Sequence, residues 1–136
     1  MRRRILLFVR AAALASLVVA GAACSDTAVI GPANQLEVSN APGTFQWQVI
    51  ALDKVTQTLT YTWTNNGATA NVNQDSSVSS GTATLRITDA SGTEVYSASL
   101  SQNGTFQTGA GTPGDWTVVV TLDKASGAAN FRLQTP

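Results

Sequence analysis

Apolar and polar residues alternate over most of the chain from Thr44 onward, and this period-two pattern constrains the fold more than any other feature. Residues 45–49, 59–63, 83–87, 116–122 and 131–133 follow it, with threonine at many of the polar positions. Successive side chains of a strand point to opposite faces, so each segment should place one face on a core and the other in water. Threonine, valine and aromatic residues also favour strands. The pattern therefore predicts an all-β domain.

Short polar segments separate the alternating runs and indicate how many strands to expect. Residues 65–67 (Asn-Asn-Gly), 89–92 (Asp-Ala-Ser-Gly) and 103–104 (Asn-Gly) favour tight turns, and we expect each to join the two strands of a hairpin. Residues 112–114 and 125–127 contain glycine and predict two more reversals. The spacing predicts eight to nine short strands, which are typical of an antiparallel β-sandwich or a small barrel.

The distribution of charge argues against nucleic-acid binding. Four of the eight basic residues lie in the first ten positions, so the chain from Ser25 onward has four basic and eight acidic residues, a net charge of −4. An acidic domain with four scattered cations is not suited to a row of phosphates. The chain also lacks histidine, which is the usual general base and the commonest transition-metal ligand. Its single cysteine excludes an internal disulfide.

Residues 1–23 have the composition of a secretory signal peptide. Residues 2–4 are three arginines, an apolar stretch follows with one interruption at Arg10, and the segment ends in Ala-Gly-Ala-Ala before Cys24. A membrane-spanning helix is the alternative, but it needs about 20 continuous apolar residues, and the uninterrupted stretch here is shorter. We therefore expect a cleaved signal.

Cys24 directly follows these small residues and decides what kind of signal to expect. Residues 22–24 (Ala-Ala-Cys) resemble the end of a bacterial lipobox, in which the thiol receives diacylglycerol and the cysteine becomes the mature N-terminus. Gly21 departs from the leucine most often found three positions before that cysteine, and ordinary cleavage that leaves a free thiol is the alternative. Several acyl chains, at about 0.8 kcal/mol per buried CH₂, would anchor the chain to a membrane. Ser25, in place of the aspartate that retains lipoproteins in the inner membrane, favours the outer membrane in a cell that has one.

Residues 24–43 have the composition of a flexible tether, with small and polar residues interrupted by Gly-Pro and Pro-Gly pairs. One short alternating segment within it, residues 36–38, is able to add an edge strand. The expected organisation is a lipoprotein signal peptide (residues 1–23), a lipidated cysteine with its tether (24–43) and a β-domain (44–136).

Two segments of the β-domain resemble a known family. Residues 81–92 (GTATLRITDASG) and 114–120 (GDWTVVV) are similar to the late strands of bacterial pre-peptidase C-terminal-like domains. That resemblance covers residues 44–134 and implies a jelly-roll-type β-sandwich without catalytic residues. Such domains are often attached to secreted enzymes, whereas here the domain stands alone behind a predicted lipid anchor.

No catalytic arrangement is evident among the ionisable residues. Lys54 and Lys124 each follow an aspartate at a predicted strand end, which is typical of solvated turn charges. Asp89, Asp115 and Asp123 lie in turns that favour aspartate, so a carboxylate pair for glycoside hydrolysis has little support. We expect no enzyme activity, no cofactor and no dedicated metal site. A structural calcium ion near Asp89 and Asp115 is the metal alternative.

The three tryptophans bear on what the domain binds. Trp47, Trp63 and Trp116 are in phase with the apolar faces of their predicted strands, so core packing is favoured over an exposed platform for sugar rings. A patch of outward-facing apolar residues would instead indicate a protein partner. Four apolar residues fall out of phase and are expected to face outward or to mark bulges: Ile50, Leu52, Tyr96 and Val119.

The function expected from the sequence is a lipid-anchored, non-catalytic β-sandwich that acts as an interaction or structural module in the cell envelope. A carbohydrate- or peptidoglycan-binding module is the alternative, and it requires at least one outward-facing aromatic residue. The expected partners are the membrane, through lipid on Cys24, and an envelope protein or a glycan, but not nucleic acid.

Overall fold

The structure is a computed structural model that describes residues 28–136, so the predicted signal peptide and Cys24 lie outside the described residues. Within this range the fold is all-β, as predicted, and every pair of strands is antiparallel. No helix of this range is long and apolar enough to cross a membrane. The elements are η1 (Pro32–Asn34), β1 (Glu37–Ala41), β2 (Thr44–Asn65), β3 (Asn71–Gln74), β4 (Ser77–Thr88), β5 (Glu94–Ser99), β6 (Gly104–Gln107) and β7 (Gly114–Gln134).

There are seven strands rather than the eight to nine predicted. The difference comes from β2 and β7, which are 22 and 21 residues long. Each contains two alternating runs that the sequence suggests as separate strands: 45–49 and 59–63 in β2, and 116–122 and 131–133 in β7. Bulges instead of turns join the two runs, so the strand continues through the irregular segment.

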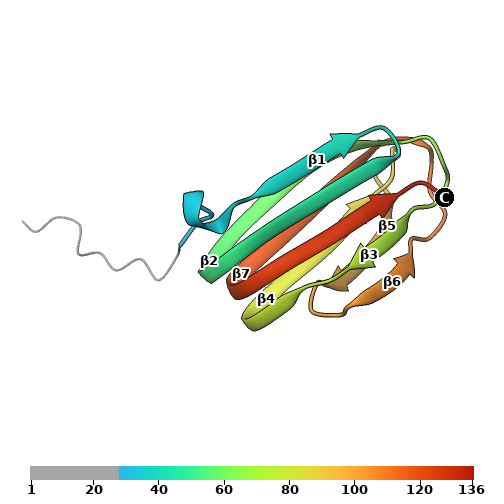
Figure 1. Ribbon diagram of the computed structural model, residues 1–136. Helices are drawn as coiled ribbons and strands as arrows, with labels where there is room; N and C mark the ends of the chain where they lie inside the picture. Colours follow the sequence, from blue (N-terminus) through green and yellow to red (C-terminus); the bar gives the residue numbers. More distant parts are fainter. Residues whose placement is uncertain (1–27) are drawn as a thin grey trace, which may run out of the picture.

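The long strands fold back over themselves. Trp47 Nε1 donates a hydrogen bond to the Tyr61 hydroxyl at 2.9 Å, and the rings of Phe45 and Tyr61 lie 5.3 Å apart. All three residues belong to β2, and a straight strand would separate Trp47 from Tyr61 by about 46 Å at a rise of about 3.3 Å per residue. β2 therefore reverses its direction between them. Figure 1 shows β2, β4 and β7 turning from one layer of strands to the other at the same end of the molecule.

The registers assign the strands to these two layers. The first layer holds β1, the first half of β2, the second half of β7, β3 and β6, in that order. The second layer holds the second half of β2, the first half of β7, β4 from Thr82 onward and β5. β2 and β7 pair in both layers, so Trp47 lies opposite Phe131 in the first layer and Trp63 lies opposite Trp116 in the second.

The bend consists of bulges at the same level in three neighbouring strands. The register of β2 on β7 shifts between Val49 and Gln57, and that of β4 on β7 shifts between Val78 and Thr82. Residues 125–127, which the sequence predicts as a reversal, form the β7 part of this bend. Positive φ angles accompany the change of direction at five positions: Ala51, Lys54, Gly81, Lys124 and Gly127.

The core fills the space between the two layers. Trp47, Trp63 and Trp116 are each 0% exposed, so their predicted core packing is confirmed. The rings of Trp63 and Trp116 meet edge to face with centroids 6.1 Å apart, an arrangement that aromatic pairs favour. Replacing a fully buried tryptophan by alanine costs about 3–5 kcal/mol, so these residues contribute strongly to stability.

The out-of-phase apolar residues form no exposed patch. Leu52 is buried at the bend, while Ile50 and Val119 are half-buried. Tyr96 packs partly against the core, and its hydroxyl donates a hydrogen bond at 2.6 Å to Oε1 of the buried Gln74. Gln74 Nε2 in turn donates to two backbone carbonyl groups, at 3.0 and 2.6 Å. This network connects β3 in the first layer to β5 in the second.

One of the three predicted hairpins is confirmed. Residues 89–92 join β4 to β5, and these two strands pair with each other. Residues 65–67 instead lead from the second half of β2 to β3 in the other layer, and residues 103–104 lead from β5 to β6, which pairs with β3. The hairpin predictions at these two turns are therefore wrong. Turn residues permit a tight reversal, but the burial pattern of the long strands decides which strands pair.

Residues 28–34 attach to the bend, and we call them the strap. The Thr56 N–H donates a hydrogen bond to the Ala28 carbonyl at 2.9 Å. Asn34 is buried, and its Nδ2 donates to two backbone carbonyl groups of the bend at 3.1 and 2.8 Å. The segment predicted as a tether thus includes the strap and β1, which is the edge strand suggested by residues 36–38.

Gly81 offers a test of the bend. Its φ is +69°, and a Cβ atom there would clash with the backbone carbonyl of Lys124, whereas Gly92 has a φ of +86° with open space around it. We expect Gly92→Ala to cost about 1–2 kcal/mol from left-handed backbone strain alone. Gly81→Ala should cost clearly more, or prevent folding, because the clash adds to the same strain. Urea unfolding of both variants measures the difference, and equal losses would show that the bend tolerates a side chain.

Candidate functional site

One broad face of the domain is covered by amide and hydroxyl side chains. It is the outer face of the first layer, and its residues alternate with the core residues of that layer. All of its side chains are exposed or half-buried, and amides are the largest group among them. We call this the amide face, which consists of Glu37, Ser39, Thr44, Gln46, Gln48, Asn71, Asn73, Asp75, Thr105, Gln107, Asn130, Arg132 and Gln134.

Cross-strand pairing arranges these side chains in rows. Gln46 lies opposite Ser39 on one side and opposite Arg132 on the other. Arg132 in turn lies opposite Asn73 of β3, and Asn73 lies opposite Thr105 of β6, so one row crosses five strands. Residues directly opposite each other have Cβ atoms about 4.5–5.5 Å apart, so one ligand is able to contact several side chains of a row.

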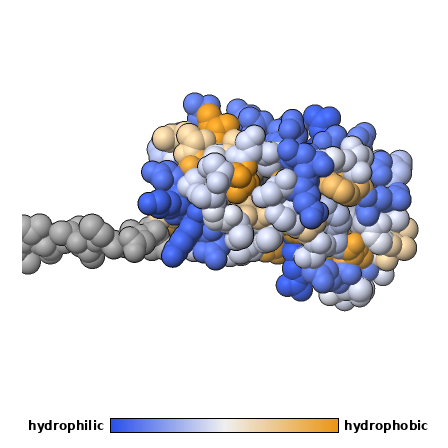
Figure 2. Space-filling model, turned by 90° about the horizontal axis from the view of Figure 1, so that it is seen from below, coloured by the Kyte–Doolittle hydropathy of each residue, from blue (hydrophilic) through white to orange (hydrophobic). Residues whose placement is uncertain are grey.

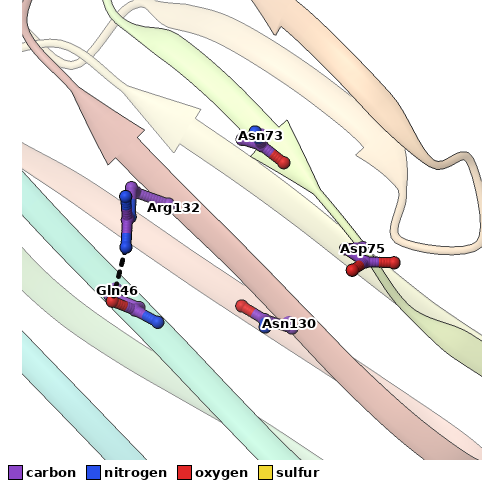
Figure 3. Close-up of a pocket in the computed structure, with 5 residues that line it drawn as sticks. All are labelled: Gln46, Asn73, Asp75, Asn130 and Arg132. Carbon is purple, nitrogen blue, oxygen red and sulfur yellow. Dashed lines mark hydrogen bonds between the residues drawn. The ribbon is translucent and has the colours of Figure 1, made fainter.

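A shallow hollow of about 170 Å³ opens within the amide face. Gln46 and Arg132 lie on one side of it, where Arg132 Nη2 donates a hydrogen bond to Gln46 Oε1 at 3.3 Å (Figure 3). Asn73 and Asp75 approach from β3 and the segment after it, and Asn130 approaches from β7. Figure 3 draws a single hydrogen bond among these five residues, so the asparagines and the aspartate do not engage one another. Their side-chain donors and acceptors are therefore available to a polar ligand in the hollow.

A second hollow of about 140 Å³ adjoins the first, and the two share Gln46. It lies over β1 and β2 and is also lined by Glu37, Val38, Ser39 and Gln48. Each hollow is smaller than the pockets of about 300–1,000 Å³ that enclose small molecules. The amide face is therefore better suited to the surface of an extended polymer than to an enclosed substrate.

The outer face of the second layer is also polar and nearly neutral. Thr58, Thr121 and Thr84 lie opposite one another across three strands. Among the described residues an exposed ion pair joins Arg86 to Glu94 at 3.1 Å. We call this the threonine face, which consists of Thr58, Thr60, Thr62, Thr64, Thr84, Arg86, Thr88, Glu94, Ser97, Ser99, Asp115, Thr117, Val119 and Thr121.

Neither face includes an aromatic side chain in the part of the chain from residue 28 to residue 136. The aromatic residues of this part are buried in the core or packed partly against it. Stacking of a sugar ring on an outward-facing aromatic residue, which the glycan-binding alternative requires, is therefore not offered by these residues. Figure 2 shows the side seen from below with apolar residues only in small, separate spots.

The ionisable residues considered for catalysis are divided between the bend and the start of β7. Lys54 and Lys124 are exposed at the bend. Asp123 is beside Lys124, whereas Asp115 lies eight residues earlier on β7, about 26 Å away at the rise of a strand. Asp115 there accepts a hydrogen bond from the Thr64 hydroxyl at 3.1 Å. Because a glycosidase pair needs carboxylates about 5–9.5 Å apart, Asp115 and Asp123 do not form one.

Asp89 binds its own chain with both carboxylate oxygens. Oδ1 accepts hydrogen bonds from the Ser91 N–H, the Ser91 hydroxyl and the Thr93 N–H, and Oδ2 accepts one from the Thr112 N–H at 2.8 Å. The Thr112 N–H lowers the pKa of Asp89 most, and with the donors of Ser91 and Thr93 it brings that pKa to about 2 against the opposing effect of burial. Asp89 thus connects the β4–β5 turn to the segment before β7.

These contacts give no support to the calcium alternative. Asp89 has its oxygens engaged by the chain, and Asp115 is bonded to Thr64. Over residues 28–136, no group of three or more His, Cys, Asp or Glu side chains is placed to hold a metal ion.

The sequence prediction did not single out the amide face, although part of its signal is present. Gln46 and Gln48 occupy the polar positions of one alternating run, and Asn130 and Arg132 occupy those of another. Alternation alone assigns such residues to solvent. The register is needed to place runs from separate strands side by side, and it is not readable from the pattern of a single segment.

Asp89 makes the stability of the domain depend on pH. Its folded-state pKa of about 2 lies below the ordinary value of 3.8, so its contribution is complete above about pH 4 and is lost as the pH falls toward 2. Asp89→Asn should lower the thermal unfolding midpoint at pH 6, and the deficit relative to the original protein should shrink between pH 4 and pH 2. Asp123→Asn, at an exposed position, is the control. A deficit that stays constant over this range would contradict the assignment.

Comparison with known proteins does not indicate a function for the chain. No family model matches the chain, and no curated protein matches it either. The resemblance of residues 81–92 and 114–120 to pre-peptidase C-terminal-like domains therefore stays a prediction.

Proposed function

We propose that the chain is a lipid-anchored, non-catalytic module of the cell envelope that binds a partner through its amide face. The observation that carries this proposal is the pair of adjoining hollows in a broad hydrogen-bonding face. The separation of Asp115 from Asp123, about 26 Å along β7, supports a non-catalytic role, because a pair of catalytic carboxylates must converge on one substrate.

The proposed architecture is a jelly-roll-like β-sandwich similar to pre-peptidase C-terminal-like domains. The contact of Trp47 with Tyr61 supports it, because that contact places the two halves of β2 in opposing layers. The position of β7, between β2 and β3 in one layer and between β2 and β4 in the other, is also in keeping with a sandwich.

The proposed partner is an extended segment of another envelope protein. Asparagine and glutamine amides both donate and accept hydrogen bonds, so they match the peptide groups of such a segment. β1 is an exposed edge strand without proline or lysine, and unprotected edges accept an added strand. Val38 of β1 lies opposite Trp47 on the inner side of the sheet and is 40% exposed, so it offers an apolar contact at the open edge.

A glycan is the alternative partner. The amides of Asn73 and Asn130 and the guanidinium of Arg132 in the first hollow also suit sugar hydroxyl groups, although without an aromatic platform. Binding by hydrogen bonds alone would be weak, because each bond replaces one to water and contributes about 0.5–1.5 kcal/mol.

The proposed anchor is diacylglycerol on Cys24, with sorting to the outer membrane favoured by Ser25. Cys24→Ala should abolish incorporation of a tagged fatty acid and release or mislocalise the protein. Ser25→Ala, which keeps the thiol, should still be labelled and is the control. Mass spectrometry of the mature N-terminus checks the lipid directly. Membrane retention of the original protein without any lipid on Cys24 would contradict the anchor.

The partner surface is tested by photo-cross-linking in intact cells. A photoreactive amino acid at Ser39, on β1 and the amide face, should give a defined protein adduct, and one at Thr60 on the threonine face should give none. Val38→Lys should weaken the Ser39 adduct, because a charged side chain on an edge strand opposes strand addition. Adducts of equal yield from both positions, or none from Ser39, would count against a peptide partner.

The glycan alternative has a separate readout. Calorimetric titration of the protein with envelope polysaccharides should give no saturable heat if the partner is a peptide segment. Saturable heat that disappears in Arg132→Ala would assign the amide face to a glycan instead.

A further inference from the structure

The point where the described chain begins lies on the bend. Ala28 forms a parallel bridge with Val55, and its carbonyl accepts the hydrogen bond from the Thr56 N–H. Two residues further on, the Ile30 N–H donates to Gln57 Oε1 at 2.9 Å. Asn34 completes the attachment through its bonds to the bend carbonyls. The strap is therefore fixed to one end of the domain, and Figure 1 shows it at the end where β2, β4 and β7 turn over.

Few residues separate the proposed lipid from this fixed point. Only residues 25–27 lie between Cys24 and Ala28. Even fully extended, the four steps from Cys24 to Ala28 span at most about 14 Å, at about 3.3–3.6 Å per residue. The half of β2 that runs from Gln57 to Asn65 is about twice as long, near 26 Å at the rise of a strand. The lipid therefore holds the bend close to the bilayer.

The broad faces of the domain offer little that would bind lipid, so nothing favours the domain lying on its side. The amide face has one basic residue, Arg132, together with the acidic Glu37 and Asp75. On the threonine face Arg86 is paired with Glu94. A polybasic cluster or a large apolar patch is needed to attach such a face to a membrane surface.

The exposed surface of the bend is compatible with contact with lipid headgroups. Lys54 and Lys124 are exposed there beside Asp53 and Asp123, so these four charges cancel and neither repel nor strongly attract an anionic bilayer. Val29 of the strap is 65% exposed, the highest fraction among the exposed large hydrophobic residues between positions 28 and 136. It lies next to the point where the chain arrives from Cys24.

We infer that the bend rests on the headgroup surface of the membrane that holds the lipid, with the strands of the domain upright on it. This inference rests on the proposed lipid attachment at Cys24 and adds which end of the domain faces the bilayer. The loops at the opposite end, including residues 65–70 and 89–93, then point away from the membrane. The amide face is then perpendicular to the bilayer surface and accessible from the envelope space.

The test measures the distance from each end of the domain to the bilayer in the lipidated full chain. Cys24 is the only cysteine, and its thiol is blocked by lipid, so one added cysteine accepts one fluorophore. Ser80→Cys marks the bend and Asn66→Cys marks the opposite end, and both positions are exposed. The proteins are placed in phosphatidylcholine vesicles containing phosphatidylethanolamine with an acceptor dye on its headgroup. Unchanged thermal unfolding of each variant is the folding control.

Energy transfer should be clearly stronger from position 80 than from position 66, because the second label lies about 25–30 Å further from the surface. Insertion of 20 glycine and serine residues between Thr27 and Ala28 should remove most of the difference, because the domain is then free to tumble. Equal transfer from both labels without the insertion, or stronger transfer from position 66, would overturn the upright orientation while leaving the anchor intact. Absence of lipid on Cys24 by mass spectrometry would overturn the anchor and the orientation together.

Discussion

The aligned bulges of β2, β4 and β7 are the constraint on which the rest of the structure depends. Three neighbouring strands change direction at one level, so both layers are made from the same strands and stay in register with each other. Contacts between distant parts of one strand, such as that of Trp47 with Tyr61, then become core contacts. Without the bend, Trp63 and Trp116 would lie on a sheet face with no layer to cover it, and the apolar surface that drives folding would stay in water.

The bend gives the domain two broad outer faces, one on each layer, and both are polar. On either side of the bend, every second side chain of a strand points to solvent. The solvent-facing side chains are mostly amides in the first layer and mostly threonines in the second. Within the bend the alternation gives way to a spacing of three, and Val49, Leu52 and Val55 are all buried. These residues close the core at the turned end, where two straight strands joined by a loop would leave it open.

The sequence predicts the alternating runs on either side of the bend but not the bend itself. The phase of each alternating run correctly predicts that the three tryptophans are buried, because in-and-out periodicity is a local property. The continuity of β2 is not predictable in that way, because the positive φ angles at Ala51 and Lys54 occur at residues that do not ordinarily signal them. Residues 65–67 show the converse, since Asn-Asn-Gly there has the chemistry of a hairpin turn but leads to a strand in the other layer. The amide face is missed for the same reason, because it exists only once the register has brought five strands together.

The strap changes what kind of partner is compatible with the amide face. A tether of twenty residues would present the face in every orientation, whereas residues 28–34 are attached to the bend, so only residues 25–27 separate the proposed lipid on Cys24 from the folded domain. In the proposed orientation, with the bend on the bilayer, β1 would run along the membrane normal, and a segment that adds to β1 would also run along it. Such a partner would extend away from the membrane surface over the length of a strand. A polypeptide emerging from the same membrane meets this requirement, whereas a polymer lying flat above the bilayer would cross β1 instead of pairing with it.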